Sequence, residues 1–270
     1  MSVVKRWLKN IFYTTGNART LDRIIYLRAY LRYWPNNRRY TRKYPQLLLP
    51  PAYFLYETYT PDYERYMTDG RIAAEEIMGW TLPYLTQRPL NILEWGCGVG
   101  RIIRHIPAFT PSGTRISGCD INDEMIRWNR ENLPGIDFSR INQLPPTPYP
   151  DERYCLVYAI SVFTHIDGRE HVLWCRELNR IMSTGGILLF TTHGEHFIHQ
   201  LSGNELKQFR KDGYFTRSYP DKGHRMMTTY NDPQKLRSAF SEFFDVLEFH
   251  DGNKNPGMTG GQDLWILKKK

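Results

Sequence analysis

The chain has 270 residues, a formal net charge of +8 and 41% hydrophobic residues. This length suits one α/β domain of about 200 residues with an appendage. No apolar run reaches the length of a membrane span, and the N-terminus lacks the continuous apolar stretch of a signal peptide, so we expect a cytoplasmic protein. The four cysteines have no paired spacing, and we expect reduced thiols that serve as small core residues.

The basic residues are concentrated at the N-terminus. Residues 1–50 hold eleven Lys or Arg and one acid, Asp22, whereas residues 51–270 hold 25 bases and 27 acids. A nucleic-acid-binding domain carries a basic patch or stripe. The balanced charge of the body therefore disfavours a nucleic-acid partner and assigns the positive charge to an N-terminal arm.

The first part of this arm has the pattern of a basic amphipathic helix. Residues 2–13 place five apolar residues at helical spacing, with basic residues opposite: Val4, Trp7, Leu8, Ile11 and Phe12. This composition is typical of interfacial membrane helices, so residues 1–18 are a candidate contact with an anionic membrane. Docking on the protein's own body or on a second subunit is the alternative, and the oligomeric state is left open.

A second helix is predicted from Thr20 to about Trp34, where Pro35 ends it, followed by a connector over residues 35–51. Residues 51–66 then carry six aromatic side chains. Tyrosines suit stacking on sugar rings, but their spacing is also that of a helical stripe packed on the core. We expect most of them to pack, and Tyr56, Tyr59 and Tyr63 are candidate substrate contacts at the mouth of a pocket. A helix is predicted over residues 70–84.

Residues 90–105, LNILEWGCGVGRIIRH, predict a strand, a tight glycine turn and a helix that starts at Ile102. Glycines permit backbone angles closed to other residues and let a ligand approach main-chain N–H groups. A dinucleotide fingerprint would place its third glycine at position 101, where Arg101 stands. The loop therefore favours a smaller nucleoside.

A second predicted strand, residues 114–119, ends at Asp120, about twenty residues further on. Doubly wound folds place a carboxylate there, against ribose hydroxyls. A strand, an E-x-G-x-G-x-G turn, a helix, a second strand and an acid in this order indicate a nucleoside-type cofactor.

With these motifs the chain resembles the class I S-adenosylmethionine (SAM) dependent methyltransferases, over roughly residues 70–270. Residues 141–166, 183–194 and 262–269 continue the resemblance, while Cys155 stands where the family usually has Asp. The resemblance implies a doubly wound, Rossmann-like α/β sheet, mostly parallel with an antiparallel last strand, here with an N-terminal helical extension. SAM is the implied cofactor and S-adenosylhomocysteine its product. The implied cofactor contacts are Glu94, Gly96, Cys97, Gly98, Gly100, Arg101, Asp120, Ile121, Asn142, Gln143, Leu144 and Ser161.

The later elements follow the same scheme. Helices are expected over residues 122–132, 169–182 and 232–240, and strands over 136–139, 153–161, 187–192, 244–250 and 262–269. Residues 195–231 form a long insertion, which is often a lid over a site. The expected domains are an arm with a tyrosine-rich cap, residues 1–69, and a methyltransferase domain, residues 70–270.

Two strand ends carry histidines that suit a general base. Methyl transfer to a hydroxyl requires alignment and removal of a proton, for which histidine is the usual choice. His165 follows strand four, with Phe163 as a candidate substrate contact, and His193 follows strand five. The sequence TTHG around His193 resembles enzymes encoded among genes for polysaccharide and glycan assembly, so His193 is the preferred catalytic residue and His165 the second.

The cluster of residues 193–199, HGEHFIH, matches no tight zinc motif, whereas Mg²⁺ binds through few protein ligands and would leave little trace. The leading hypothesis is a SAM-dependent O-methyltransferase of a saccharide or glycan, lipid-linked or not. A methyltransferase of a small metabolite, a peptide or RNA is the alternative, as is a SAM-binding module without catalysis. A dinucleotide oxidoreductase is the remaining rival, against which the glycine spacing speaks.

Overall fold

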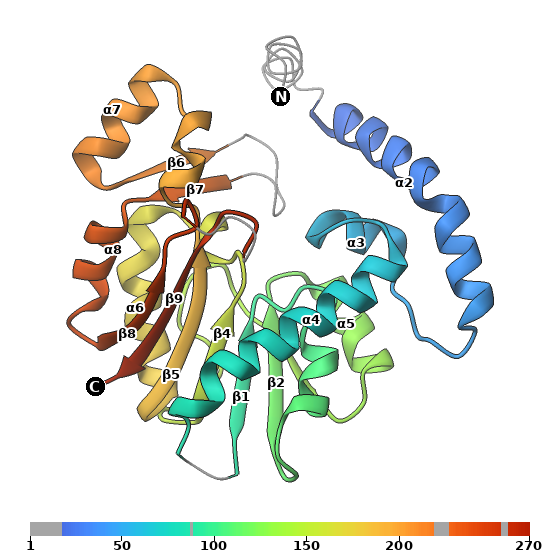
Figure 1. Ribbon diagram of the computed structural model, residues 1–270, viewed down its shortest axis with the longest axis horizontal. Helices are drawn as coiled ribbons and strands as arrows, with labels where there is room; N and C mark the ends of the chain where they lie inside the picture. The colour runs from blue at the N-terminus through green and yellow to red at the C-terminus, as the bar shows by residue number, and fades with distance from the viewer. Residues whose placement is uncertain (1–17, 87–88, 219–226, 255–258) are drawn as a thin grey trace.

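The computed structural model describes residues 18–86, 89–218, 227–254 and 259–270. A seven-stranded sheet with the order β3-β2-β1-β4-β5-β9-β8 forms its centre (Figure 1). The strands are β1 (Asn91–Trp95), β2 (Arg115–Asp120), β3 (Asp137–Arg140), β4 (Tyr154–Ala159), β5 (Met182–Thr192), β8 (Phe244–His250) and β9 (Asp263–Lys269). The first five pair in parallel, and β9 runs antiparallel to both β5 and β8. The predicted Rossmann-like fold with an antiparallel last strand is therefore confirmed.

The central strands are buried on both faces, as their continuous apolar sequences require. Phe190 and Leu188 of β5 face one cluster together with Trp174 and Phe240, while Leu189 faces the other. Helices α6 (His171–Ile181) and α8 (Pro233–Phe240) cover the first face. Helices α4 (Tyr63–Thr81) and α5 (Asp123–Asn132) and the 3₁₀ segment η2 (Ile103–Phe109) lie on the second.

Three helices begin at the side-chain caps that their sequences offer. Asp62, Asn122 and Asp232 accept hydrogen bonds from main-chain N–H groups at the starts of α4, α5 and α8. Such caps satisfy donors that the first helical turn leaves without partners. Short 3₁₀ segments complete the body: η1 (Leu82–Tyr84), η3 (Phe163–His165) and η4 (Gly168–Glu170).

The helix expected over residues 70–84 begins earlier, as α4 at Tyr63, and ends in η1, and the strand expected from residue 187 begins at Met182. Two further differences involve proline. Helix α2 (Ala18–Lys43) continues through Pro35, so the predicted end at Trp34 and the connector after it are wrong. The segment after the glycine turn is η2, which contains Pro107, in place of the predicted α-helix. Proline removes one backbone donor in either case.

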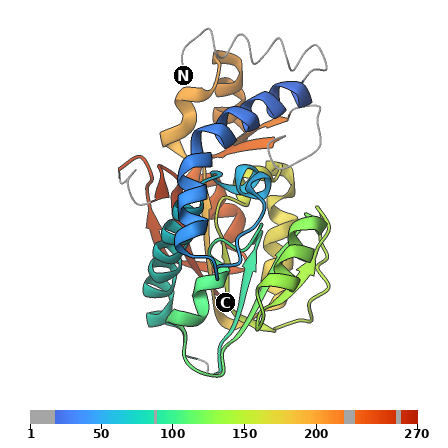
Figure 2. The same cartoon turned by 90° about the vertical axis from the view of Figure 1, so that its right-hand side faces the viewer.

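The N-terminal helices pack against each other and against α4. Helix α3 (Ala52–Thr58) packs with α2, and α2 also contacts α4 (Figure 2). The predicted division between residues 69 and 70 falls inside α4, so the cap and the sheet share a helix. Residues 1–17, which include the whole of the predicted amphipathic helix, lie outside the described part of the chain.

The insertion after β5 has secondary structure of its own. It contains η5 (Glu195–Gln200), α7 (Gly203–Asp212) and an antiparallel pair, β6 (Tyr214–Ser218) and β7 (Met227–Asn231). All four cysteines are buried thiols, and no disulfide joins any two of them, as expected. Among the described residues, no helix has the length and apolar content needed to cross a membrane.

Candidate active site

The glycine turn after β1 adopts the left-handed geometry that its sequence predicts. Gly96, Gly98 and Gly100 have φ angles of 77°, 50° and 74°. The N–H groups of Gly96 and Cys97 donate to the carbonyl oxygen of Cys119, at 2.8 and 3.0 Å. The N–H of Gly98 donates to the Asp120 carboxylate at 2.8 Å. The turn is thus held directly against the end of β2.

The N-terminal cap fixes this turn from the other side. The Tyr66 hydroxyl donates to the carbonyl oxygen of Val99 at 2.8 Å. A methyl group added to Gly98 would lie 2.8 Å from Cγ2 of Thr58, and one added to Gly70 would lie 2.2 Å from the carbonyl oxygen of Arg101. Glycine is needed at both positions because the cap helices approach the turn so closely.

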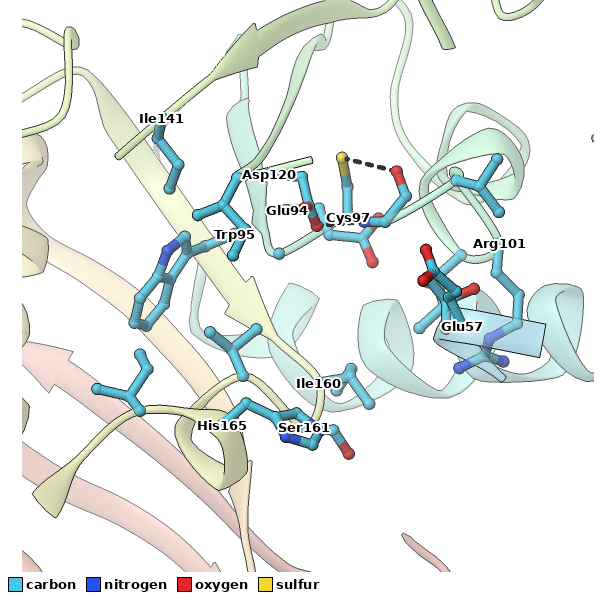
Figure 3. Close-up of a pocket in the computed structure, with 18 of the residues that line it drawn as sticks. Glu57, Glu94, Trp95, Cys97, Arg101, Asp120, Ile141, Ile160, Ser161 and His165 are labelled. Carbon is cyan, nitrogen blue, oxygen red and sulfur yellow. Dashed lines mark hydrogen bonds between the residues drawn. The ribbon is translucent and has the colours of Figure 1, made fainter. Parts of the chain in front are cut away.

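A cavity of about 630 Å³ opens at the carboxyl ends of the parallel strands (Figure 3). Figure 3 shows Trp95 and Ile141 on one side of it and Glu57 and Arg101 on the other. Ligands of open α/β sheets bind at this edge. Ten of the residues selected from the sequence line the cavity: Glu94, Gly96, Cys97, Gly98, Arg101, Asp120, Ile121, Gln143, Ser161 and His165.

Other selected residues lie away from the cavity lining. Gly100 faces Leu133 and Asn129 behind the turn, and Asn142 and Leu144 are exposed beside Gln143. The side chain of Phe163 is 0% exposed and packs against Trp95 and Phe190. The position of Phe163 in the core contradicts the prediction that it contacts substrate, because a ligand cannot reach it.

The three selected tyrosines also lie outside the lining. Tyr56 is buried and donates to the Asp22 carboxylate at 2.8 Å, so it joins α3 to α2. Tyr59 donates to Asp69 at 2.6 Å, with the guanidinium of Arg101 4.4 Å from its ring centroid. Tyr63 borders a second, smaller cavity beside α2. The tyrosines mainly pack, and Tyr59 acts on the cavity only through Arg101.

Several lining residues were not selected from the sequence. They are mostly apolar and come from six separate segments: Glu57, Thr58, Trp95, Val99, Ile102, Ile141, Ile160, Val162, Ile166, Trp174 and Met227. Trp95 and Ile141 directly adjoin selected residues, so their strand-end positions were available as a signal. Glu57 and Met227 reach the site through tertiary packing, which the local sequence does not encode.

The cavity carries three carboxyl groups and one guanidinium. Burial raises the pKa of Glu94 from its ordinary value to about 8, although the Tyr158 hydroxyl donates to the carboxyl at 3.1 Å. Burial also raises the pKa of Asp120, against hydrogen bonds from the N–H groups of Asn122 and Gly98. Arg101 is the cation beside them. A ligand with positive charge would favour the ionised form of both carboxyls.

His165 lies on the cavity wall, at the end of η3. Its Nδ1 is 2.8 Å from the main-chain oxygen of Met227. Because a carbonyl oxygen only accepts, Nδ1 carries the proton and Nε2 carries the lone pair. Desolvation by the surrounding protein lowers the pKa of His165, while the bond to Met227 acts in the opposite direction. The imidazole is therefore neutral near pH 7 and able to accept a proton through Nε2.

His193 lies near His165 but is not among the residues that line the cavity. Its ring packs 4.3 Å from Phe197 and 5.8 Å from Tyr230, centroid to centroid. Burial, together with the nearby His165, lowers its pKa to about 4, and Nδ1 has no hydrogen-bond partner among the described residues. Of the two histidines, His165 lines the cavity, whereas the ring of His193 packs against Phe197 and Tyr230.

Ser161 links the cavity to the last hairpin. It has a positive φ of 62°, its N–H donates to Oγ1 of Thr191 at 2.8 Å, and its hydroxyl accepts from the Gln262 amide at 2.6 Å. Within the described residues, no group of three metal-ligating side chains is found. Glu195 of the histidine-rich segment instead pairs with Arg210 at 2.7 Å.

Comparisons with known proteins agree with this geometry. A family model described as "Methyltransferase domain" matches residues 92–186. Malonyl-(acyl-carrier protein) O-methyltransferase of Legionella pneumophila is 31% identical over 121 residues, which are 42% of this chain and 39% of that protein. Sterol 24-C-methyltransferase of Gibberella zeae is 32% identical over 104 residues, 36% of this chain and 26% of that protein. The chain thus matches less than half the length of either relative.

Solved structures share the fold at low identity. A SAM-dependent methyltransferase from Methanosarcina mazei superposes with a TM-score of 0.53 at 19% identity, covering 70% of this chain and 96% of the other. A SAM-dependent methyltransferase from Mesorhizobium loti superposes with a TM-score of 0.52 at 16% identity, covering 73% of this chain and 98% of the other. Residues 92–186 are thus similar to a methyltransferase domain, and the fold of the chain is the one that SAM-dependent methyltransferases of known structure share.

The residues present fit the cofactor of this class. The cavity has room for a nucleoside, its glycine turn admits a ligand close to the main chain, and its carboxyls suit a sulfonium cation. Asp120 stands where the resemblance places the partner of the ribose hydroxyls. The apolar wall of Trp95 and Ile141 offers a flat surface for a base.

Proposed function

We propose that this protein is an O-methyltransferase that uses SAM and takes the proton of the acceptor hydroxyl on His165. The observation that carries the proposal is the hydrogen bond from Nδ1 of His165 to Met227, because it places the ring proton on Nδ1 and the lone pair on Nε2 in a residue that lines the cavity. When bound, SAM supplies an activated methyl group. The protein supplies alignment and a base.

Each part of the site has one task in this proposal. The glycine turn and Asp120 hold the cofactor, and Glu94 supplies negative charge once it is ionised. Neutral His165 accepts the hydroxyl proton at Nε2 as the oxygen becomes nucleophilic. The β6–β7 hairpin positions that ring through Met227 and through the hydrogen bond from the Thr229 hydroxyl to the carbonyl oxygen of Ile166, 2.6 Å long. The hairpin thus supports the base and closes one side of the cavity as a lid.

For the acceptor we propose a saccharide or glycan hydroxyl. The resemblance of the TTHG segment to enzymes of glycan assembly supports this choice, as does the absence of an amino-group methyltransferase motif after β4. The named relatives are methyltransferases of a malonyl-acyl-carrier protein and of a sterol. We also propose that residues 1–18 contact an anionic membrane.

The test is methyl transfer from tritiated SAM to panels of saccharides, hydroxylated metabolites, peptides and RNA. The proposal predicts label in an alkali-stable ether on a saccharide. Label in an amine, a carboxyl ester or RNA would contradict it. SAM binding without transfer to any panel would favour a non-catalytic SAM-binding module.

A further inference from the structure

Helix α2 has its polarity inverted relative to an ordinary surface helix. Its inward face is built from tyrosines and polar groups: the Tyr26 ring lies 5.2 Å from both Tyr53 and Tyr56, and Asn37 donates to the carbonyl oxygen of Pro61 at 2.9 Å. Its outward face carries aliphatic side chains and arginines. A helix that only packs on its own domain buries its apolar stripe, so this outward face calls for a partner.

Among the described side chains of α2, four of the five exposed large apolar residues form one line along the helix, and Ile25 lies beside it. Ile24, Leu27, Leu31 and Trp34 follow each other at spacings of three, four and three residues, and we call them the outer stripe. All four are exposed, with Leu27 at 54% and Leu31 at 61%. Spacing of this kind places them on one side of the helix, where together they make a continuous apolar surface in contact with water.

The charge around the outer stripe has one sign. Helix α2 contains eight basic residues and a single acid, Asp22, and that acid faces inward and accepts from the Tyr56 hydroxyl. The exposed arginines flank the stripe and follow it: Arg23, Arg28, Arg32, Arg38, Arg39 and Arg42. A second copy of the chain is a poor occupant, because two such helices would repel each other. The complementary surface is apolar and anionic.

The outer stripe ends beside a small cavity. Trp34 and Arg38 border a cavity of about 290 Å³ whose other walls include Tyr30 and Tyr63. The Arg38 guanidinium lies 5.2 Å from the ring centroid of Trp34. The wall behind is rigid, because Asn37 also accepts from the N–H of Tyr63 at 2.9 Å. A guanidinium beside aromatic rings suits an anionic head group at the level where tryptophan prefers to lie.

We propose that α2 lies on an anionic lipid surface, with the outer stripe entering the boundary between head groups and acyl chains and the flanking arginines contacting lipid phosphates. Apolar area combined with basic side chains gives this kind of attachment. The surface is distinct from residues 1–17 and from the cavity at the strand ends. It makes α2 a membrane-facing element of the methyltransferase.

Cosedimentation of the full chain with vesicles tests this proposal. The vesicles contain phosphatidylcholine alone or with 30% phosphatidylglycerol. We expect binding to the anionic vesicles only, weakened by salt. The double substitutions Leu27→Gln/Leu31→Gln and Arg28→Glu/Arg32→Glu should each lower the partition coefficient about tenfold or more. Matched controls on the body, Leu173→Gln at 47% exposure in α6 and Arg127→Glu in α5, should bind as the original chain does.

Calorimetry with S-adenosylhomocysteine and circular dichroism verify that each variant is folded. Absence of binding to anionic vesicles would overturn the proposal, as would α2 variants that bind like the original chain. Binding lost only when residues 2–17 are deleted would assign the contact to that arm. A dimer in light scattering that Leu27→Gln/Leu31→Gln dissociates would show that a second copy covers the stripe. None of these outcomes depends on which acceptor is methylated.

Discussion

The Nδ1 of His165 lies 2.8 Å from the main-chain oxygen of Met227, so a hydrogen bond joins η3, the turn after β4, to the β6–β7 hairpin. Met227 and His165 both line the cavity. The insertion therefore contributes to the candidate active site by fixing the orientation and the tautomer of one imidazole. Such a carbonyl contact is the usual means of setting which histidine nitrogen serves as base.

Replacing His165 with Asn tests the roles of the two ring nitrogens separately. The Asn amide can keep the bond to Met227 but has no base at the position of Nε2, so turnover should fall about 10²- to 10⁴-fold. SAM affinity should change little. Steady-state kinetics and calorimetry measure the two effects. His193→Asn is the matched comparison and should lose less than tenfold in turnover; the reverse ranking would make His193 the base.

Asp120→Asn should weaken SAM binding about 10- to 100-fold. The carboxylate accepts from the N–H groups of both Gly98 and Asn122, and the amide can accept through only one oxygen. Asp123→Asn serves as the control, since Asp123 lies nearby in α5 and pairs with the exposed Arg127. Equal affinities of the two variants in calorimetry would remove Asp120 from the cofactor site.

Two glycine substitutions should shift stability in opposite directions. Gly98→Ala forces a side chain into a φ of 50° and against Thr58, which should cost about 1–3 kcal/mol and impair SAM binding. Gly79→Ala in α4 meets no atom within 4 Å and should stabilise the protein by about 0.4–1 kcal/mol. Thermal denaturation gives both values. A Gly98→Ala protein as stable as the original would mean that the turn is less constrained than described.

SAM affinity should rise with pH up to about 8 because of Glu94. The folded protein without ligand holds this carboxyl protonated up to about pH 8, whereas in the unfolded chain it ionises near its ordinary value. The contribution of Glu94 to stability is therefore full at low pH and lost as pH rises toward 8. A bound sulfonium makes the ionised form of Glu94 the favoured one. SAM binding should therefore release a proton, and S-adenosylhomocysteine binding should release a smaller fraction of a proton.

Calorimetry in buffers of different ionisation enthalpy counts these protons. Glu94→Gln should abolish the difference between the two ligands while keeping the hydrogen bond from Tyr158. Identical proton release for SAM and S-adenosylhomocysteine in the original chain would show that Glu94 does not respond to the sulfonium.

The elements most accurately predicted are those whose signals are local. The bounds of β8 match, α5 begins after its Asn122 cap, and Asp120 ends β2 beside the glycine turn. Period, capping and turn chemistry determine these features within a few residues. The predicted end of the helix before Pro35 was wrong because hydrogen bonds of Asn37 with Pro61 and Tyr63 stabilise α2 beyond the proline.

Whether a side chain lies in the core or on the cavity wall was harder to predict than the position of a strand. Phe163 and His165 are two residues apart, yet one is in the core and the other on the cavity wall, because the 3₁₀ turn η3 separates their directions. His193 ends its strand as expected, but Phe197 and Tyr230 of the insertion cover it. Contacts between segments far apart in sequence decide such cases, and no local pattern records them.

The central claim is that the cavity at the strand ends binds a SAM-type nucleoside. Calorimetric titration of the full chain with S-adenosylhomocysteine, with NAD as the comparison ligand, tests it most directly. The structure predicts one saturable site for S-adenosylhomocysteine, weakened in Asp120→Asn and unchanged in Asp123→Asn, and no heat from NAD. Binding of NAD, or of neither ligand, would contradict the claim and with it every role assigned to the cavity.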